Sequence, residues 1–115
     1  MRMIRLTVLY NLPHNQDEDE FLKWRLGEHQ SANMSMEGVV ASEFHKILND
    51  NAGAVPAYRF LTTVDWPDRE SFEKGFYDPQ VQAGLKENLE KISDPVFLVS
   101  ECLIRESSDT KRGRA

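Results

Sequence analysis

Cysteine is nearly absent from this sequence: its 115 residues include one, Cys102. A single thiol cannot form an internal disulfide, which excludes a disulfide-stapled secreted scaffold and favours a reducing compartment, the cytoplasm. No apolar run approaches the roughly 18 residues needed to cross a bilayer. Lys and Arg number 14 against 19 Asp and Glu, so neither nucleic acid nor an anionic membrane is expected as a partner.

Motifs for common cofactors are also missing. The chain has no glycine-rich phosphate loop and no nucleophile elbow, which argues against ATP and dinucleotide binding. Its three histidines, His14, His29 and His45, have no spacing that would bring two metal ligands together. We therefore expect no metal and no cofactor, and we expect Cys102 to be a buried, unreactive thiol.

What is present suffices for one folded unit. Hydrophobic residues make up 40% of the chain and charged residues 29%, and the length fits one domain of roughly 100–150 residues. We expect a single domain over residues 1–105. Residues 106–115 are polar and are predicted to form a disordered tail.

Residue patterns predict strands and helices in the order βαββαβ. Segments rich in β-branched and aliphatic residues predict strands over 3–10, 38–48, 57–65 and 96–104. A helical apolar period predicts one helix over about 17–34, and start signals at Asp68 and at Asp78-Pro79 predict a second helical region ending near Ser93. This order is typical of an α+β, ferredoxin-like fold with both helical regions on one face of a four-stranded antiparallel sheet.

The terminal strands carry apolar residues on both of their faces. In the first strand Leu6 and Val8 share one face, and Met3 and Leu9 point the other way. Helices can cover only one face of such a sheet, so an apolar patch would remain exposed, and patches of this kind mark interfaces. We therefore predict a homodimer in which two sheets pack face to face as a dimeric α/β barrel.

Several short motifs, taken in order, resemble the EthD family. They are the strand Ile4–Tyr10, the pair Phe21 and His29 eight residues apart, and Ser93–Val96 before the last strand. The resemblance spans about residues 3–104 and implies a dimeric α+β barrel with a small-molecule pocket. Members of the family accompany degradative or polyketide-tailoring enzymes. This chain departs from the family at Arg25, which replaces an aromatic residue, and at Gln30-Ser31-Ala32, which replaces a segment leading through a proline.

His29 is the first candidate for a catalytic role, because an imidazole suits proton transfer near pH 7. It shares a helical phase with Leu22 and Leu26 and should therefore face the sheet. The alternative is a structural histidine that bonds a carbonyl near a helix end. Arg25, one turn earlier, could hold a carboxylate or enolate oxygen, or it could form an ion pair with Glu28 or another glutamate.

Aromatic side chains supply the remaining candidates. The predicted substrate-binding residues are Tyr10, Phe21, Trp24, Tyr58 and Phe60. Each of them could instead belong to the core. Trp66 is expected to plug the end of the sheet, and the pair Glu43 and His45 could relay a proton or form a polar contact at an edge.

Two functions remain open at this point. The chain could be an EthD-like protein acting on ether, aromatic or polyketide-type compounds in a catabolic or oxidative pathway, with His29 transferring a proton without a cofactor. It could instead bind a metabolite without turnover, or serve as an accessory to an oxygenase system. Haem binding, as in haem-degrading proteins of the same fold, is disfavoured because one helix histidine is a weak signal. Whether the protein is an enzyme stays open.

Overall fold

A computed structural model describes residues 2–108. The elements are, in chain order, β1 (Ile4–Asn11), α1 (Glu18–Trp24), the π-helical turn η1 (Arg25–His29), α2 (Gln30–Met34), β2 (Ala41–Lys46), β3 (Phe60–Trp66), α3 (Arg69–Phe76), α4 (Pro79–Asn88), the 3-10 turn η2 (Leu89–Lys91) and β4 (Ser93–Glu101). Residues 106–108 of the predicted tail have no regular structure, and residues 109–115 lie outside the described residues.

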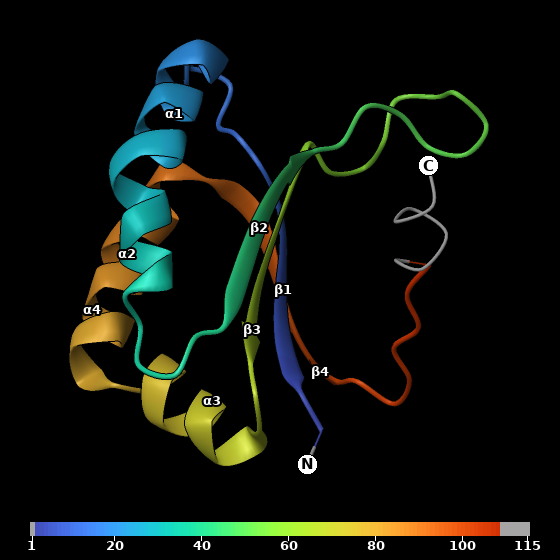
Figure 1. The fold of residues 1–115 in the computed structure, drawn as a ribbon. Helices are drawn as coiled ribbons and strands as arrows, with labels where there is room; N and C mark the ends of the chain where they lie inside the picture. The colour runs from blue at the N-terminus through green and yellow to red at the C-terminus, as the bar shows by residue number, and fades with distance from the viewer. Residues whose placement is uncertain (1, 109–115) are drawn as a thin grey trace.

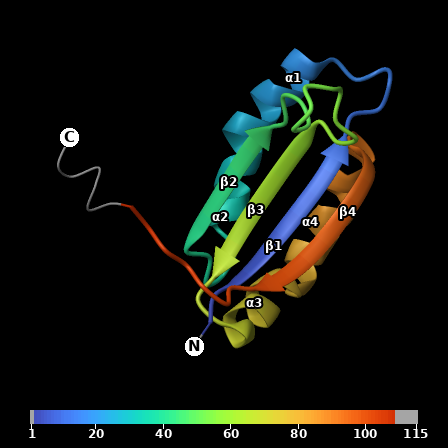
Figure 2. The same ribbon diagram turned by 90° about the vertical axis from the view of Figure 1, so that its right-hand side faces the viewer.

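The four strands form one antiparallel sheet in the order β2-β3-β1-β4. All helices lie on one face of this sheet (Figure 1), and the other face is open to view in Figure 2. The ferredoxin-like α+β fold predicted from the order of elements is confirmed.

Alternation along β1 explains how the helices and the sheet meet. Ile4, Leu6 and Val8 are buried, while the residues between them are only partly covered. The antiparallel register sets Val8 opposite Thr62 and Ile4 opposite Trp66 on β3. Paired residues point to the same face, so the buried set of β1 and its partners form the floor under the helices.

The predicted helix start signals are confirmed. The carboxylate of Asp17 accepts the N–H groups of α1, and Asp68 and Asp78 do the same for α3 and α4. A cap of this kind stabilises a helix by about 1 kcal/mol. The caps therefore set the residue at which each of these helices begins.

Three details differ from expectation or sharpen it. β2 begins at Ala41, three residues later than predicted, because Gly38 has φ +81 and turns the chain before the strand starts. Gly27, a glycine inside a helical segment, is exposed and makes no close packing contact: a Cβ there would meet nothing within 4 Å. Trp66 does plug the sheet end, fully buried, with its indole N–H donating to the Glu37 carbonyl at 3.0 Å.

The open face of the sheet carries an apolar patch at one end. There the apolar residues Leu9, Leu61, Val96 and Leu98 lie on adjacent strands. Toward the other end Arg5 donates to both oxygens of Asp65, at 2.8 and 3.0 Å. The predicted apolar second face is therefore confirmed for this patch. Beyond it, the ion pair between Arg5 and Asp65 makes the open face polar.

Candidate functional site

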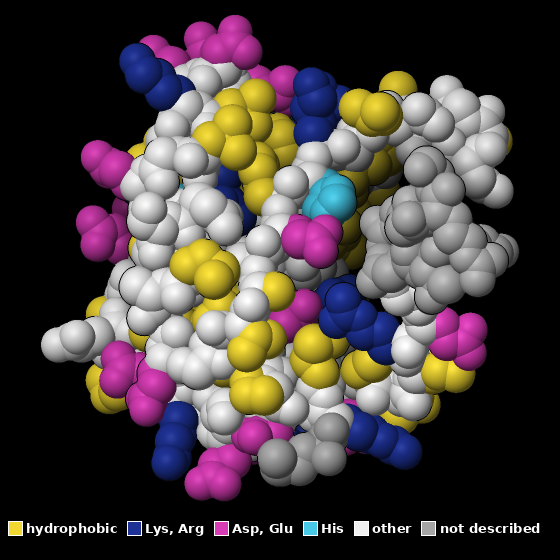
Figure 3. Space-filling view, viewed as in Figure 1, with side chains coloured by type: hydrophobic (Ala, Val, Ile, Leu, Met, Phe, Trp, Pro, Cys, Tyr) yellow, Lys and Arg dark blue, Asp and Glu magenta, His cyan; other side chains and the backbone are white. Residues whose placement is uncertain are grey.

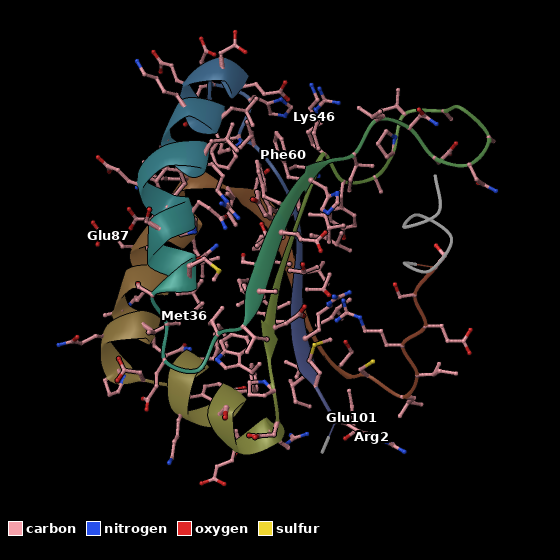
Figure 4. All side chains as sticks on the ribbon, in the orientation of Figure 1. Arg2, Met36, Lys46, Phe60, Glu87 and Glu101 are labelled. Carbon is pink, nitrogen blue, oxygen red and sulfur yellow. The ribbon has the colours of Figure 1, made fainter. Side chains whose placement is uncertain are left out.

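A cavity of about 510 Å³ lies between the helices and the covered face of the sheet. Hydrophobic side chains gather along this gap in Figure 3, and Figure 4 shows Met36 reaching toward the sheet while Glu87 points away from it. Both the helices and the sheet supply its apolar lining, which consists of Leu6, Val8, Phe21, Trp24, Val64, Phe76, Leu85 and Phe97. The volume and the apolar lining are typical of small-molecule sites.

The π-helical turn η1 directs two polar side chains into this cavity. Arg25 is 1% exposed and His29 is half-buried, and both line the cavity. Leu26 is 65% exposed, so the prediction that it shares the buried phase with His29 is wrong. The wider turn rotates Leu26 outward while Arg25 and His29, at the two ends of the turn, stay on the inner side. Turns of this type are frequent at functional sites.

Arg25 is surrounded by neutral groups. Its Nη1 donates to Oε1 of Gln30 at 2.8 Å, and its Nη2 donates to Oγ1 of Thr62 at 3.2 Å. The guanidinium carbon lies 4.3 Å from the centre of the Phe44 ring. Burial lowers the pKa of Arg25, and its interaction with Tyr10 acts in the opposite direction.

The alternative of an ion pair between Arg25 and a glutamate is not supported. Within residues 2–108 no carboxylate forms an ion pair with Arg25, and Glu28 lies exposed on the outer side of η1. A buried cation whose partners are all uncharged is costly in the absence of an anion. This is the most unusual electrostatic feature of the cavity.

Thr62 links Arg25 to Tyr10. The Tyr10 hydroxyl and Oγ1 of Thr62 lie 3.2 Å apart, and both residues are buried and line the cavity. Thr62 was not among the residues predicted from the sequence. A signal existed, because Thr62 is the polar residue between Phe60 and Val64 on the inward phase of its strand, where an apolar residue is expected.

His29 lies in a partly buried, positively charged environment. Burial, and then the charges of Arg25 and Lys91, lower the pKa of His29 from 6.5 to about 4. The imidazole is therefore neutral at pH 7. Its ring stacks on Trp24 with the centroids 4.6 Å apart. The Lys91 ammonium also lies over the Trp24 ring, 4.9 Å from the ring centroid.

Asn88 of α4 contacts His29 and was also missed from the sequence. Its Nδ2 lies 3.3 Å from Nδ1 of His29. Which ring nitrogen carries the proton depends on how this amide is turned, because an amide nitrogen donates and an amide oxygen accepts. Asn88 therefore selects the tautomer, which decides whether Nε2 can accept a proton. Nothing in the sequence pairs residues 59 positions apart.

The predicted site residues divide into two groups. His29, Arg25, Tyr10, Phe21 and Trp24 all line the cavity. Phe60 is fully buried against Phe44, at a centroid distance of 5.5 Å, and does not line it. Tyr58 lies in the loop before β3 and is not a lining residue either.

The remaining polar candidates lie elsewhere. Nε2 of His45 is 2.8 Å from Oε1 of Glu43, and both side chains are exposed on the open face. Cys102 is half-buried and is a free thiol. Over residues 2–108 no cluster of three His, Cys, Asp or Glu side chains could hold a metal ion. No helix in the same range is long and apolar enough to span a membrane.

No protein-family model and no curated protein sequence matches the chain. Solved structures do match its fold. An EthD family protein from Bacillus halodurans has a TM-score of 0.74 and 17% identity, covering 88% of this chain and 99% of its own. The hydroxynitrile lyase of Passiflora edulis has a TM-score of 0.70 and 14% identity, covering 91% and 95%.

A third match concerns assembly. A dimeric ferredoxin-like protein of unknown function from Thermobifida fusca has a TM-score of 0.66 and 17% identity, covering 88% of this chain and 92% of its own. Identities this low establish the fold and leave the reaction undetermined. One of these three proteins, the hydroxynitrile lyase, is an enzyme with this arrangement of helices and sheet. The chain has the EthD-like, ferredoxin-like fold that the sequence resemblance implied.

Proposed function

We propose that the protein binds a small, largely apolar molecule in the cavity and transfers a proton to or from it through His29 without a cofactor. One observation carries this proposal: a neutral imidazole and a buried guanidinium line the same apolar cavity. The pairing suits a substrate with an acidic C–H bond beside a carbonyl group. The substrates would be aromatic or polyketide-type compounds, or intermediates of an oxidative catabolic pathway.

The proposed step balances as a simple proton transfer. The lone pair on Nε2 of His29 takes a proton from the carbon next to the carbonyl, and the C–H electron pair moves to the carbonyl oxygen as an enolate. Arg25 and the Tyr10 hydroxyl stabilise the negative oxygen. In the structure the Asn88 amide nitrogen faces Nδ1, which leaves the proton on Nε2. The step therefore requires the Asn88 amide to turn over, so that its carbonyl accepts from Nδ1–H and Nε2 is free to accept.

Deuterium exchange tests the proposal without knowledge of the substrate. The native protein is incubated in D₂O with phenylacetone as the probe, and exchange beside the carbonyl is followed by NMR. We expect catalysed exchange, reduced about 10²–10⁴-fold by His29→Gln, which keeps a polar side chain of similar size. His45→Gln, on the open face, is the matched control and should exchange at the native rate. Equal rates for native protein and His29→Gln would sink the catalytic role.

A non-catalytic role is the second candidate. The observation that favours it is the low pKa of His29, since a base with a pKa of about 4 is weak at pH 7. Under this alternative, the native protein and His29→Gln bind phenylacetone with similar affinity and neither catalyses exchange.

We also propose that the functional unit is a homodimer formed through the open face. The support is the patch made by Leu9, Leu61, Val96 and Leu98, together with the dimeric assembly of the protein from Thermobifida fusca. A second copy would bury this patch, as two packed sheets do when they share an apolar layer.

A further inference from the structure

We propose that the ligand of the cavity carries a carboxylate and that this carboxylate binds the Arg25 guanidinium. In the free protein, the Gln30 amide oxygen occupies the position that the carboxylate would take. The inference rests on the proposed small-molecule pocket. It does not depend on proton transfer by His29, so the two can fail separately.

The first step is the charge of Arg25. A guanidinium stays protonated in proteins even when buried, and Arg25 is 1% exposed. Gln30 and Thr62 accept its hydrogen bonds, and both are neutral. A buried positive charge with neutral partners is stabilised strongly by a planar carboxylate, which can accept two parallel N–H groups.

The second step concerns the surrounding charges. The charged groups that act on His29, on the same side of the cavity, are Arg25 and Lys91, both positive. Two acidic residues line the cavity, Glu37 and Asp78, and both are exposed. The Asp78 carboxylate is engaged by the N–H groups that begin α4. The end of the cavity that holds Arg25 is therefore electropositive and selects an anion.

The third step is access to Arg25. Its low exposure means that neighbouring side chains close over the guanidinium. Gln30 is half-buried, lies one residue beyond η1 and places Oε1 2.8 Å from Nη1. A glutamine side chain reorients at modest cost, whereas Thr62 is held within the sheet. The Gln30 oxygen is thus the acceptor that a carboxylate would displace, with the apolar body of the ligand against Trp24, Leu85 and Phe97.

Binding of a matched pair of probes tests the inference on the native protein. Isothermal titration compares 3-phenylpropionate with 3-phenylpropionamide, which has nearly the same shape and no charge. We expect the acid to bind roughly ten- to a hundredfold more tightly, as charge-assisted hydrogen bonds do. Equal affinities for the acid and the amide would overturn the inference.

Substitutions at Gln30 provide the second test. Gln30→Glu supplies an internal carboxylate to Arg25, and we expect it to weaken binding of the acid at least about tenfold and to raise the melting temperature. Gln30→Ala removes the placeholder and should bind the acid at least as tightly as the native protein. Unchanged acid binding in Gln30→Glu, together with an unchanged melting temperature, would contradict the placeholder role.

His29→Gln separates this inference from the proposed function. It should keep the preference for the acid over the amide while losing deuterium exchange of phenylacetone. Selective binding of the acid by a native protein that catalyses no exchange would remove the catalytic proposal and leave the carboxylate site. Exchange without any preference for the acid would remove the carboxylate site and leave the catalysis.

Discussion

His29 shows how neighbouring charges change the chemistry of one residue. Its sequence context fits a base with a pKa near 6.5, but burial and two nearby cations lower this pKa to about 4. Burial is the largest cause of this shift, and the charges of Arg25 and Lys91 add to it. A ligand carboxylate on Arg25 would weaken this repulsion and raise the pKa of His29 toward its ordinary range, which would make it a stronger base.

The lowered pKa of His29 predicts how stability depends on pH. Between about pH 6.5 and 4 the unfolded chain binds a proton at His29 that the folded chain does not. The free energy of unfolding should therefore be constant above about pH 7 and fall as the pH decreases to 4. We expect a loss of roughly 1–2 kcal/mol after allowance for solvent screening.

Urea unfolding of the native protein and His29→Gln at pH 7 and pH 5 measures this loss. The variant should lose less stability than the native protein between these two values. Glu18 and Asp68 have lowered pKa values, and their contributions are lost mainly below pH 5. A native protein as stable at pH 5 as at pH 7 would contradict the pKa given for His29.

At the scale of elements, α3 lies very close to its neighbours at Gly75. A Cβ on Gly75 would clash with the carbonyl oxygen of Glu37 and lie 2.7 Å from the indole nitrogen of Trp66. These two atoms form the hydrogen bond that anchors Trp66 at the end of the sheet. The absence of a side chain at Gly75 therefore allows α3 to pack against both the sheet end and the segment before β2.

Gly75→Ala should destabilise the protein by about 2–3 kcal/mol, because the added methyl group forces apart a backbone contact that cannot yield cheaply. Gly84→Ala in α4 is the matched control, since its Cβ would meet nothing within 4 Å. We expect this control to gain up to about 1 kcal/mol from the higher helix propensity of alanine. Urea denaturation of both variants provides the measurement, and equal stabilities would refute the packing argument.

At the scale of the whole molecule, one layer of helices covers one face of the sheet and leaves the other uncovered (Figure 2). The cavity lies on the covered face and the apolar patch on the open face. Both surfaces follow from the alternation of side chains along the same strands. The proposed ligand site and the proposed dimer interface therefore lie on opposite faces of one sheet, and substitutions can test them separately.

Leu98→Glu tests the dimer. Leu98 is 50% exposed on the open face, on the edge strand β4 and opposite Thr7 on β1. A carboxylate buried there without a partner costs several kcal/mol, so association should weaken by roughly a hundredfold or more. Leu26→Glu, on the outer side of η1, should leave association unchanged. Sedimentation velocity at micromolar concentration decides: a monomeric native protein, or a dimeric Leu98→Glu, would disprove the interface.

The amino-acid sequence by itself determined the order of strands and helices, the helix starts at Asp17, Asp68 and Asp78, and the fold class. These features depend on local physics, namely the period of apolar residues and the capping of free N–H groups by nearby side chains. Five of the seven predicted site residues also line the cavity. Their selection rested on local patterns along one helix and one strand, together with the resemblance to the EthD family.

Only the tertiary structure decided the electrostatics of the site. The π-helical turn that rotates Leu26 outward, the contacts of Thr62 and Gln30 with Arg25, and the pairing of Asn88 with His29 have no local signature. Packing of α4 and β3 against η1 creates these contacts, and charge interactions depend on distance and burial rather than on spacing along the chain. The lowered pKa of His29 and the burial of Arg25 without a carboxylate partner among the described residues are therefore consequences of packing.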